Sequence, residues 1–587
     1  MEVTRVFDIL PHYALHFQRN DALCGKQNGV WRHYSINQYI ETVNNISYGL
    51  MQLGIKKGDK IATISSGRPE WNFLDMAILQ LGAIHVAIYP TISENDYKYI
   101  LHHAEVKMVF VSGWDILRKI ENIISEIPEI KDNVYTFRNL RGYRHLNEVI
   151  ELGMANPSPQ YLDEIKERIS PDDIMTLIYT SGTTGNMKGV ILTHRNIINN
   201  FKAIVPIVPI HSQNRVLSYL PLCHIYERMM NYAWQYLGIP IYYAESLPTI
   251  ADNMREIKPT IFTTVPRLLE KFYDKIIATG RKQKGIKKRI FFWADAIATS
   301  FELENVSKLY RLKLKIARKL VLCKWKAALG GKIDVIVSGG AAIQPRLNRL
   351  FWAAEMPILE GYGLTETSPV IAVSDFFENG LMFGTVGQPL PGIEVKIAED
   401  GEILTRGHCV TQGYYKAEDL TKEAIDSDGW FHTGDIGHFE PKGQLRITGR
   451  KKEMFKTAFG KYIVPTIIEN KFNEESLIDN IMVLGENKQF AAALIVPNFN
   501  DLRSWCDRKG IAYTTNEEMI NHPDVIRKFK KIVAKYNASF GDTEKIIRYE
   551  LIDYEWSVAT GELTPTLKLR RNFIATKFAD KIIKLFS

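Results

Sequence analysis

The chain has 587 residues, of which 45% are hydrophobic and 24% are charged, and 74 Lys or Arg against 66 Asp or Glu give it a formal net charge of +8. This length is too great for one compact core and predicts at least two domains. The ordinary apolar content excludes wholesale disorder, and 39 Gly and 24 Pro without any period exclude a collagen-like or low-complexity protein.

The N-terminal segment carries acidic residues early and lacks an apolar run before a small-residue cleavage site, so we expect no signal peptide. The longest charge-free stretches, 76–93 and 229–244, contain polar residues, and the second also has a Gly-Ile-Pro break. A spanning helix needs about 20 mostly apolar residues, so each stretch predicts a buried helix followed by a core strand.

The five cysteines are widely spaced and form no CxxC or Cys/His cluster. This pattern predicts neither a disulfide framework nor a structural zinc site. It fits a reducing compartment, and we therefore expect a cytoplasmic location.

Short β-branched runs alternate with helical patterns over the first two-thirds of the chain. Helical segments such as YIETVNNISYGLMQLG separate several of the runs, which are KIATISS, AIHVAIYP, VKMVFVS, IMTLIYT, RVLSYLP, TIFTTVP and KIDVIVSGG. This alternation predicts an α/β fold of doubly wound parallel sheets with crossover helices.

Beyond Gly384 the sequence is rich in Gly, Pro and short alternating runs, which predicts an antiparallel sheet or a small β-barrel-like subdomain. A Gly-rich turn and a charge cluster follow in RITGRKKEMFK, and the chain from Ile463 to Ser587 has a shorter α+β pattern. We therefore expect a large N-terminal domain over 1–449 and a smaller α+β C-terminal domain over 450–587.

The segment TSGTTGNMKG, residues 180–189, lies between an apolar run and a predicted helix that starts near His194. Its glycines let backbone N–H groups converge on an anion, its four hydroxyls add donors, and Lys188 adds a positive charge. The pattern indicates a site for a triphosphate or pyrophosphate. It is not a Walker A loop, because the GxxxxGK[ST] spacing is absent. A polar turn without a ligand is the alternative.

The positive charge is concentrated in residues 271–332, which hold 17 Lys or Arg and four acids. Their local balance is +13, so the rest of the chain carries −5 of the total of +8. Apolar residues recur at helical spacing there, as at Leu309, Leu312 and Ile316, and the aromatics Phe291 and Trp325 are interleaved. One interpretation is a solvated helical insert, and the other is peripheral contact with an anionic membrane. No nucleic-acid motif is present.

Six motifs in a fixed order carry a resemblance to a known family. They are YTSGTTGNMKGVILTH at 179–194, SGGA at 338–341, EGYGLTET at 360–367, DGWFHTGDIG at 428–437, TGRKKEMFKTAFGKYIVP at 448–465 and TGELTPTLKLRR at 560–571. Together they resemble the adenylate-forming superfamily of acyl-CoA synthetases, peptide-synthetase adenylation domains and luciferase. The long forms of the last three, with PLCHIYER at 221–228 and KPTIFTTVPRLLEK at 258–271, are most similar to the long-chain fatty acyl-CoA synthetase branch.

The resemblance implies a nucleotide site. It implies that Tyr362 lies against adenine, that Thr365 contacts a phosphate, and that Asp435 and Arg450 bind the ribose. An aromatic face suits a base, and a carboxylate accepts hydrogen bonds from ribose hydroxyls. The residues that it assigns to nucleotide binding are Thr180, Ser181, Gly182, Thr183, Thr184, Gly185, Lys188, Gly339, Gly340, Ala341, Glu360, Gly361, Tyr362, Gly363, Thr365, Asp435, Arg450 and Lys568.

The resemblance also implies the groups that serve the reaction, which are Lys568, Glu366, Thr365 and His224. Lys568 would meet the acyl carboxylate and the α-phosphate and offset the repulsion between these two anions. Glu366 and Thr184 would hold Mg²⁺, which prefers hard oxygen ligands. His224 would border the acyl site, although a lone histidine at a strand end is more often structural.

Lys452 lies where the family has the hinge of a mobile C-terminal domain. Thr457-Ala458-Phe459-Gly460 departs from the commonest wording of the family loop, which leaves the details of the thioester-forming conformation open. Arg570 and Arg571, beside the predicted adenylation lysine, are interpreted as surface or structural residues.

The resemblance implies an ATP-dependent ligase that activates a long-chain fatty acid as acyl-AMP and transfers it to CoA, with release of AMP and pyrophosphate. The alternatives are a ligase for another acid or acceptor, such as an acyl-AMP ligase for a carrier protein or an aryl or medium-chain acid:CoA ligase, and a non-catalytic binding protein with this fold. The expected partners are the fatty acid, ATP, Mg²⁺ and CoA, with no nucleic acid and with peripheral contact on the inner face of a membrane through 271–332.

Overall fold

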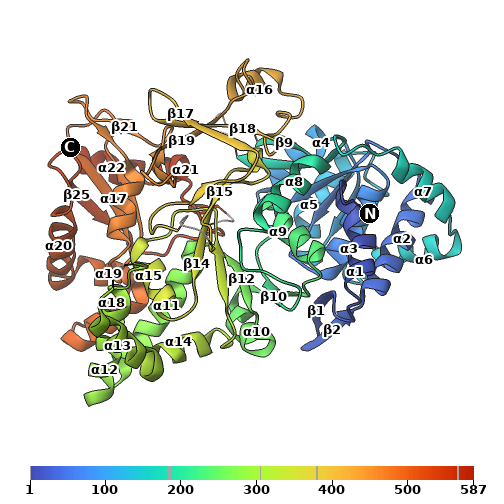
Figure 1. The fold of residues 1–587 in the computed structure, drawn as a ribbon. Coiled ribbons are helices and arrows are strands. Elements are labelled where there is room, and N and C mark those ends of the chain that lie inside the picture. Colours follow the sequence, from blue (N-terminus) through green and yellow to red (C-terminus); the bar gives the residue numbers. More distant parts are fainter. Residues whose placement is uncertain (1, 182–186, 305, 378–380, 565–566) are drawn as a thin grey trace. The chain divides into compact units, whose positions relative to one another are not determined.

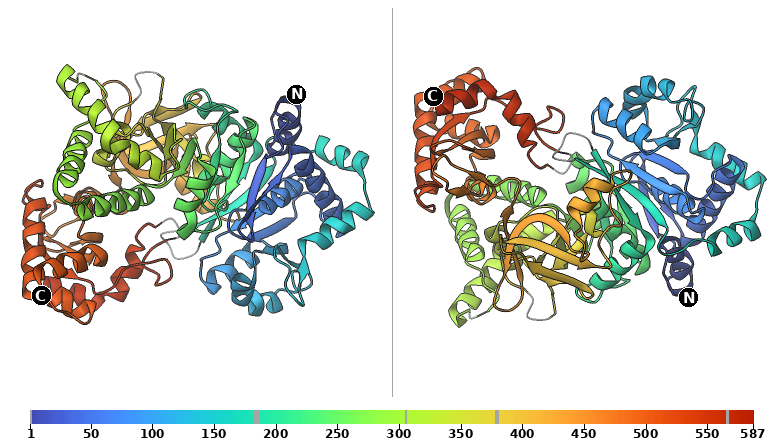
Figure 2. Two further views of the ribbon diagram at one scale, coloured as in Figure 1. Left: turned by 90° about the horizontal axis from the view of Figure 1, so that it is seen from below. Right: turned by 90° about the horizontal axis from the view of Figure 1, so that it is seen from above.

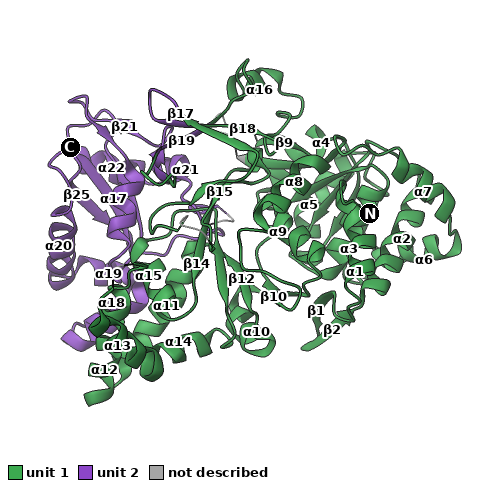
Figure 3. Ribbon diagram, in the orientation of Figure 1, with its two compact units in different colours: residues 1–396, 404–432, 439–445 green, residues 397–403, 433–438, 446–587 purple. Residues whose placement is uncertain are grey.

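The computed structural model describes residues 2–181, 187–304, 306–377, 381–564 and 567–587. The chain divides into two compact units (Figure 3). The first unit comprises residues 1–396, 404–432 and 439–445, and the second comprises residues 397–403, 433–438 and 446–587. The predicted domain boundary between residues 449 and 450 stays a prediction.

One sheet of the first unit contains seven described strands in the order β7-β6-β5-β3-β4-β8-β9. All neighbours are parallel except β8 and β9. Every residue of β4 is buried, as expected for a strand whose two faces are covered by helices. The strands are β3 (Lys60–Ile64), β4 (Ile84–Ile88), β5 (Val106–Val111), β6 (Val134–Thr136), β7 (Arg144–His145), β8 (Ile174–Ser181) and β9 (Met187–Thr193).

A second sheet of nine described strands has the order β16-β15-β14-β13-β12-β10-β11-β1-β2. Its centre is parallel, and β2, β15 and β16 pair antiparallel at the two edges. The strands are β1 (Leu23–Gln27), β2 (Val30–Tyr34), β10 (Val216–Ser218), β11 (Ile241–Tyr243), β12 (Ile261–Thr264), β13 (Val335–Ser338), β14 (Ile358–Gly363), β15 (Val370–Val373) and β16 (Gln388–Pro389).

All seven strand-like runs of the sequence form strands of these two sheets, so the predicted α/β class with parallel sheets is confirmed. The two charge-free stretches also form helix and strand: α3 (Pro69–Gln80) precedes β4, and α9 (Ile225–Tyr236) precedes β11. No described helix is long and apolar enough to cross a membrane.

Helices cover both sheets of the first unit. The helix predicted from YIETVNNISYGLMQLG begins at Ile36 and is capped by Ser35, whose hydroxyl accepts the N–H of Gln38 at 3.2 Å, as a capping box requires. The helices are η1 (Val6–Asp8), α1 (Ile9–His16), α2 (Ile36–Gln52), α3 (Pro69–Gln80), α4 (Glu94–His103), α5 (Trp114–Glu126), α6 (Leu146–Ala155), α7 (Pro159–Glu167), α8 (His194–Ile204), α9 (Ile225–Tyr236), α15 (Pro345–Ala353), η4 (Thr365–Thr367) and α16 (Glu418–Ala424).

The basic segment 271–332 is helical, as predicted, and its light-green helices lie together in all three views (Figures 1 and 2). Trp325 is buried and Phe291 packs against the same core cluster, so these two aromatics face the core rather than the surface. The helices between residues 247 and 328, which include this segment, are η2 (Leu247–Thr249), α10 (Ile250–Ile257), α11 (Pro266–Lys282), α12 (Gly285–Thr299), α13 (Lys308–Ala317), the π-helical turn η3 (Arg318–Leu322) and α14 (Cys323–Ala328).

The region after Gly384 contains a four-stranded sheet in the order β17-β18-β19-β20, built from β17 (Ile393–Ile397), β18 (Glu402–Gly407), β19 (Phe431–Phe439) and β20 (Leu445–Arg450). The second unit adds the hairpin β21 (Phe455–Lys456) and β22 (Tyr462–Ile463), and the sheet β23 (Ile478–Leu484), β24 (Ala491–Pro497) and β25 (Ile546–Leu551). Its helices are α17 (Pro465–Phe472), α18 (Phe499–Lys509), α19 (Asn516–Asn521), α20 (Pro523–Asn537), α21 (Arg571–Lys577) and α22 (Ala579–Phe586).

Candidate active site

The predicted phosphate loop closes a β-hairpin. Thr180 lies opposite Lys188 and Ser181 opposite Met187 in the antiparallel pair of β8 and β9. Strand β9 therefore stands between the loop and helix α8, which begins at His194 as predicted. The predicted residues Gly182, Thr183, Thr184 and Gly185 lie outside the described residues.

Lys188 points toward a ring rather than an acid. Its Nζ lies 4.9 Å from the centroid of the Tyr414 ring, and it makes no ion pair with any described residue. This half-buried ammonium group therefore has no fixed counter-ion among the described residues, and its predicted contact with a phosphate stays a prediction.

Glu366 is fixed by the same segment of chain. The Tyr414 hydroxyl donates to Glu366 Oε1 at 3.0 Å, and the N–H of Thr411 donates to the backbone carbonyl of Glu366 at 2.8 Å. Burial, and then the neighbouring Glu366 carboxylate, raise the pKa of Tyr414 well above its ordinary value, so the phenol remains a donor. Thr365, the first residue of η4, is half-buried beside it.

The predicted adenine segments meet at one edge of the nine-stranded sheet. Thr264, Ser338 and Glu360 lie in register on the parallel strands β12, β13 and β14. The chain then continues as Gly339–Ala341 after β13, whereas Gly361–Gly363 complete β14. Ligands of open α/β sheets bind outside the carboxyl ends of the strands, so this edge is the expected place for a nucleotide.

The backbone geometry explains why two positions at this edge are glycine. Gly340 has a φ of +80°, a conformation that favours glycine. A Cβ at Gly363 would lie 1.7 Å from the carbonyl oxygen of Pro369, so no side chain fits there. Half-buried Tyr362 stands beside this close approach and packs against the main hydrophobic core.

Glu360 and His224 have structural partners. Asn348 Nδ2 donates to Glu360 Oε1 at 3.0 Å inside the protein, so this buried carboxylate already has a partner. His224 is the N-cap of α9, and its Nδ1 accepts the N–H of Tyr226 at 3.2 Å. These contacts explain why a polar residue stands at each position, and the predicted roles in ligand binding stay predictions.

A fully buried polar network holds α9 against the seven-stranded sheet. Arg228 Nη2 and Asp75 Oδ1 are 2.5 Å apart, and Asp75 also accepts from His85 Nδ1 at 2.6 Å and from the Tyr232 hydroxyl at 2.5 Å. Burial opposes the charge, but Arg228 and His85 outweigh it and lower the pKa of Asp75. The network fixes the helix that His224 caps.

Glu227, the residue before Arg228 on α9, is a buried acid that the sequence analysis did not single out. Glu227 accepts from the Ser218 hydroxyl at 2.5 Å and from the Thr263 hydroxyl at 3.2 Å. Burial raises the pKa of Glu227 to about 7, and these two hydrogen bonds offset part of that shift. Its carboxyl group therefore titrates near neutral pH.

In the second unit, Asp435 and Arg450 form an ion pair. Arg450 Nε lies 3.1 Å from Asp435 Oδ1, and the Asp435 side chain is only 12% exposed. Asp435 is further fixed by its own N–H, which donates to the Thr433 hydroxyl at 3.1 Å. The two residues predicted to bind ribose are thus adjacent, although they come from motifs 15 positions apart in the chain.

Lys568 stands in a tight loop before α21. Its backbone N–H donates to the Thr564 hydroxyl at 3.0 Å, and its carbonyl accepts the N–H of Thr564 at 2.8 Å. The residue as a whole is exposed. The pKa of Lys568 is lowered because nearby protein displaces water and because Arg450 repels the ammonium group, while Asp435 and Glu453 attract it.

Arg571 is structural, as predicted. It donates to both carboxylate oxygens of Glu469, at 2.9 Å and 2.6 Å, and Glu469 in turn accepts the N–H of Val483 at 2.7 Å. Burial opposes charge on this side chain, but Glu469 and Glu453 raise the pKa of Arg571. This ion pair ties α21 to α17.

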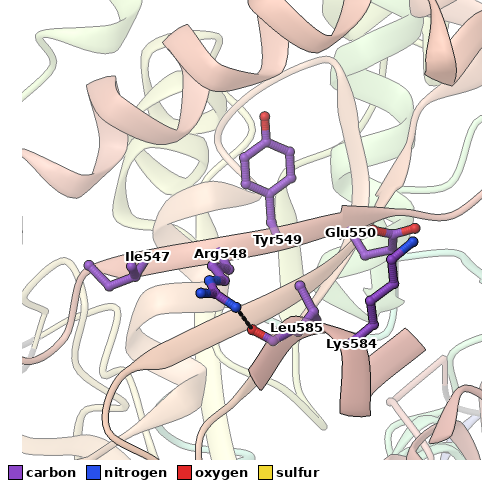
Figure 4. A pocket seen from close by; sticks show the side chains of 6 residues that line it. All are labelled: Ile547, Arg548, Tyr549, Glu550, Lys584 and Leu585. Atoms are coloured by element: carbon purple, nitrogen blue, oxygen red, sulfur yellow. Dashed lines mark hydrogen bonds between the residues drawn. The ribbon is translucent and has the colours of Figure 1, made fainter. Parts of the chain in front are cut away.

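A separate open pocket of about 310 Å³ lies on the second unit between β25 and α22 (Figure 4). Its lining residues are Ile547, Arg548, Tyr549, Glu550, Lys584 and Leu585. Arg548 Nη1 crosses it to donate to the carbonyl oxygen of Leu585 at 3.1 Å. None of the predicted site residues lines this pocket.

Comparisons with known proteins decide the family. The family described as AMP-binding enzyme matches residues 12–415, and the AMP-binding enzyme C-terminal domain matches residues 454–587. The chain belongs to the AMP-binding enzyme family. The resemblance predicted from the six motifs is thereby confirmed.

Curated relatives of this AMP-binding enzyme cover most of its length. The long-chain-fatty-acid–CoA ligase FadD15 of Mycobacterium bovis is 33% identical over 567 residues, which are 95% of this chain and 93% of the relative. The peroxisomal long chain acyl-CoA synthetase 6 of Arabidopsis thaliana is 32% identical and covers 92% of this chain, with 79% of its own length matched.

The fold also has a solved counterpart. The anthranilate CoA ligase AuaEII in complex with anthranoyl-AMP superposes with a TM-score of 0.73 and covers 98% of this AMP-binding enzyme and 97% of its own chain, at 19% identity. At that identity the likeness concerns the fold, and it agrees with the predicted combination of a large α/β domain and a smaller C-terminal domain.

Sequence reasoning missed the residue that links two of the predicted site residues. Tyr414 contacts both Lys188 and Glu366, which belong to two different motifs. It lies in the segment QGYYK, which has no residue pattern that indicates chemistry. Only the pairing of β9 with residues near 414 brings it to the two charged groups.

Proposed function

We propose that this AMP-binding enzyme is an ATP-dependent ligase that joins a long-chain fatty acid to CoA. The observation that carries the proposal is the near full-length similarity to ligases named for long-chain fatty acids. The ordered motifs and the sheet edge on which Gly339 and Tyr362 gather agree with it.

The proposed reaction has two steps, adenylation of the acid and transfer of the acyl group to CoA. A carboxylate oxygen of the fatty acid attacks the α-phosphorus of ATP, and pyrophosphate leaves, so that acyl-AMP forms. The sulfur of CoA then attacks the acyl carbonyl carbon, AMP leaves with the bridging oxygen, and the thiol proton passes to solvent. Adenylate is a far better leaving group than the oxide of a free carboxylate, which is why the first step is needed.

The roles assigned to individual residues are part of the proposal. Tyr362 stacks on adenine, Asp435 accepts from the ribose hydroxyls, and Lys188 binds phosphate. Lys568 meets the acyl carboxylate and the α-phosphate during adenylation, where a positive charge stabilises the anionic transition state. We further propose that residues 450–587 form the mobile domain and turn about Lys452 before the second step.

Magnesium fits the residues at hand. Glu366 supplies a hard carboxylate oxygen, and only its Oε1 has a hydrogen-bond partner among the described residues. The described residues contain no cluster of three or more potential metal ligands, which agrees with a Mg²⁺ ion held mainly by substrate phosphates and water. Thr184 is the second proposed ligand. When bound, the ion would neutralise charge on the phosphates.

The acid specificity can be tested with a panel of fatty acids from C6 to C20, each offered with ATP, Mg²⁺ and CoA. The proposal expects the highest kcat/KM for the long-chain acids. A clear preference for medium-chain or aryl acids would instead support a ligase for another acid. Formation of acyl-AMP without acyl-CoA would support an acyl-AMP ligase that serves a carrier protein.

We also propose that segment 271–332 contacts an anionic membrane peripherally, which would place the enzyme on the inner face of a membrane. The structure changes which apolar residues support this. Leu309, Leu312, Ile316 and Leu320 are 62%, 56%, 43% and 44% exposed, whereas Leu314, Ala317 and Val321 on the same helical run face the core. The exposed four form one stripe at helical spacing along α13 and η3.

Exposed lysines flank this leucine-rich stripe, among them Lys313, Lys315 and Lys319. Apolar side chains beside Lys are suited to a membrane interface, and each basic residue near an anionic surface contributes about 1 kcal/mol. A long-chain fatty acid partitions into bilayers, so an enzyme that uses it gains access to substrate there. The interpretation as a merely solvated insert predicts no such binding.

Co-sedimentation with phosphatidylglycerol vesicles tests this contact. Binding should appear at low salt, weaken as salt rises, and drop in a variant with Lys282, Lys284, Lys287 and Lys288 changed to Glu. The double variant Leu312→Asn/Ile316→Asn should also lose binding, whereas Leu247→Asn, another exposed leucine of the same unit, should not. A wild type that ignores these vesicles at low salt would leave the insert a solvated face.

A further inference from the structure

Tyr414 contacts two oppositely charged residues of the candidate site. Its hydroxyl donates to Glu366 Oε1 at 3.0 Å, and its ring centroid lies 4.9 Å from Lys188 Nζ. Glu366 and Lys188 are therefore neighbours of one side chain, yet no ion pair joins them. A carboxylate and an ammonium group that met directly would attract each other and form an ion pair.

The backbone of Tyr414 is fixed on both sides. It forms a β-bridge with Val190 of strand β9, and its N–H donates to the Thr421 hydroxyl of α16 at 2.9 Å. The side chain is 8% exposed. The ring is thus a rigid part of the unit rather than a surface group that can swing away.

The two contacts have different chemistry. The hydroxyl occupies one oxygen of Glu366 and turns the carboxylate so that its other oxygen has no hydrogen-bond partner among the described residues. The ring face attracts the Lys188 ammonium group through its negative quadrupole without using any of its N–H donors. Tyr414 thus contacts both charged groups, but it leaves one oxygen of Glu366 and the N–H donors of Lys188 available to a ligand.

We propose that Tyr414 is a positioning residue that keeps Glu366 available to a metal ion and Lys188 available to a phosphate by preventing an ion pair between them. This inference rests on the proposed function, since the roles of Glu366 and Lys188 belong to it. As proposed, Tyr414 touches neither the metal nor the substrate. It acts through Glu366 and Lys188.

Two substitutions separate the two contacts. Tyr414→Phe removes the hydroxyl and keeps the ring, so Glu366 loses its orientation while Lys188 keeps its ring contact. Tyr414→Leu removes both the hydrogen bond to Glu366 and the ring contact with Lys188. Tyr415→Phe is the matched control, because this neighbouring hydroxyl lies 3.4 Å from Glu105 Oε2 and contacts neither charged residue.

The measurement is the affinity for ATP by titration calorimetry, once with Mg²⁺ and once with EDTA. Loss of a group that orients a metal ligand typically weakens metal binding about 10- to 100-fold. Tyr414→Phe should lower the ratio of the two affinities by that factor and leave the affinity in EDTA within about twofold, as expected for a contact that serves only the metal ligand. Tyr414→Leu should weaken binding in EDTA as well, and Tyr415→Phe should match the wild type.

Three results would overturn the inference. A wild-type ratio in Tyr414→Phe would show that the hydroxyl is not needed for the metal. An equal loss with Mg²⁺ and with EDTA in that variant would indicate only a structural role. A wild type whose ATP affinity ignores Mg²⁺ would refute the metal assignment of the proposed function and this inference together, which distinguishes it from the first two results.

Discussion

The substitution Lys568→Ala separates activity from stability at one position. The side chain is exposed and makes no ion pair with any described residue, so its removal should change the free energy of unfolding by less than about 0.5 kcal/mol. The same charge is proposed to meet two anions in the adenylation step. Removing one such donor to a transition state typically costs about 10²–10³ in rate.

The assay measures the two half-reactions separately. Acyl-AMP formation is followed as pyrophosphate release without CoA, and thioester formation is followed from added acyl-AMP and CoA. Lys568→Ala should lose the first by about 10²–10³ and keep the second within a few-fold. Arg570→Ala is the matched control, because this exposed cation stacks on Phe573 and should affect neither step.

The pH dependence gives a second readout. The lowered pKa of Lys568 means that its charge disappears on the alkaline side earlier than that of an ordinary lysine. Wild-type adenylation should therefore fall at a pH below the ordinary lysine pKa, and the decline should be absent in the variant. Loss of both half-reactions in a folded Lys568→Ala protein would refute the assignment to adenylation alone.

Three further changes give distinct outcomes. Asp435→Ala should weaken ATP binding by about 1.5–3 kcal/mol, the value of a hydrogen bond to a charged group, and calorimetry that finds unchanged affinity would remove Asp435 from the site. Arg228→Met should lower the free energy of unfolding in urea by about 3–5 kcal/mol, because it leaves Asp75 as a buried charge, and Asp75→Asn in the same chain should restore part of the loss. The pKa of Glu227 is raised to about 7 in the folded protein. The free energy of unfolding of the wild type should therefore fall by about 3 kcal/mol as the pH rises from about 4.5 through 7. Urea titrations should show a flatter pH profile for Glu227→Gln, and parallel profiles would contradict the raised pKa.

Much of the fold can be predicted from the local pattern of apolar residues, but the basic segment 271–332 shows what this pattern does not predict. Runs such as AIHVAIYP predict buried parallel strands, because a strand that is covered on both faces is nearly continuously apolar. The leucine stripe at Leu309, Leu312 and Ile316 equally predicts a helix, and α13 forms there. Helical spacing cannot say which face meets the core, and here Leu314 and Ala317 do.

Some residues of the candidate site can likewise be predicted from local sequence, and others cannot. Tyr362 and Glu366 are predicted from one motif that is contiguous in sequence, EGYGLTET, and they lie at the end of β14 and in η4. Their roles in ligand binding stay predictions. Tyr414 could not be found, because its hydrogen bond spans 48 residues and its segment contains no group with unusual chemistry. Contacts of this kind depend on which strands become neighbours, and that is decided by the whole fold.

The most direct test of the proposed activity uses oleate labelled with ¹⁸O in its carboxylate, together with ATP, Mg²⁺ and CoA. If the acid attacks the α-phosphorus and CoA then displaces AMP, one ¹⁸O atom of each activated oleate must leave with AMP. Mass spectrometry should therefore find oleoyl-CoA and AMP in equal amounts, with the label in the AMP phosphate. Unlabelled AMP beside oleoyl-CoA, or no oleoyl-CoA at all, would contradict the proposed route.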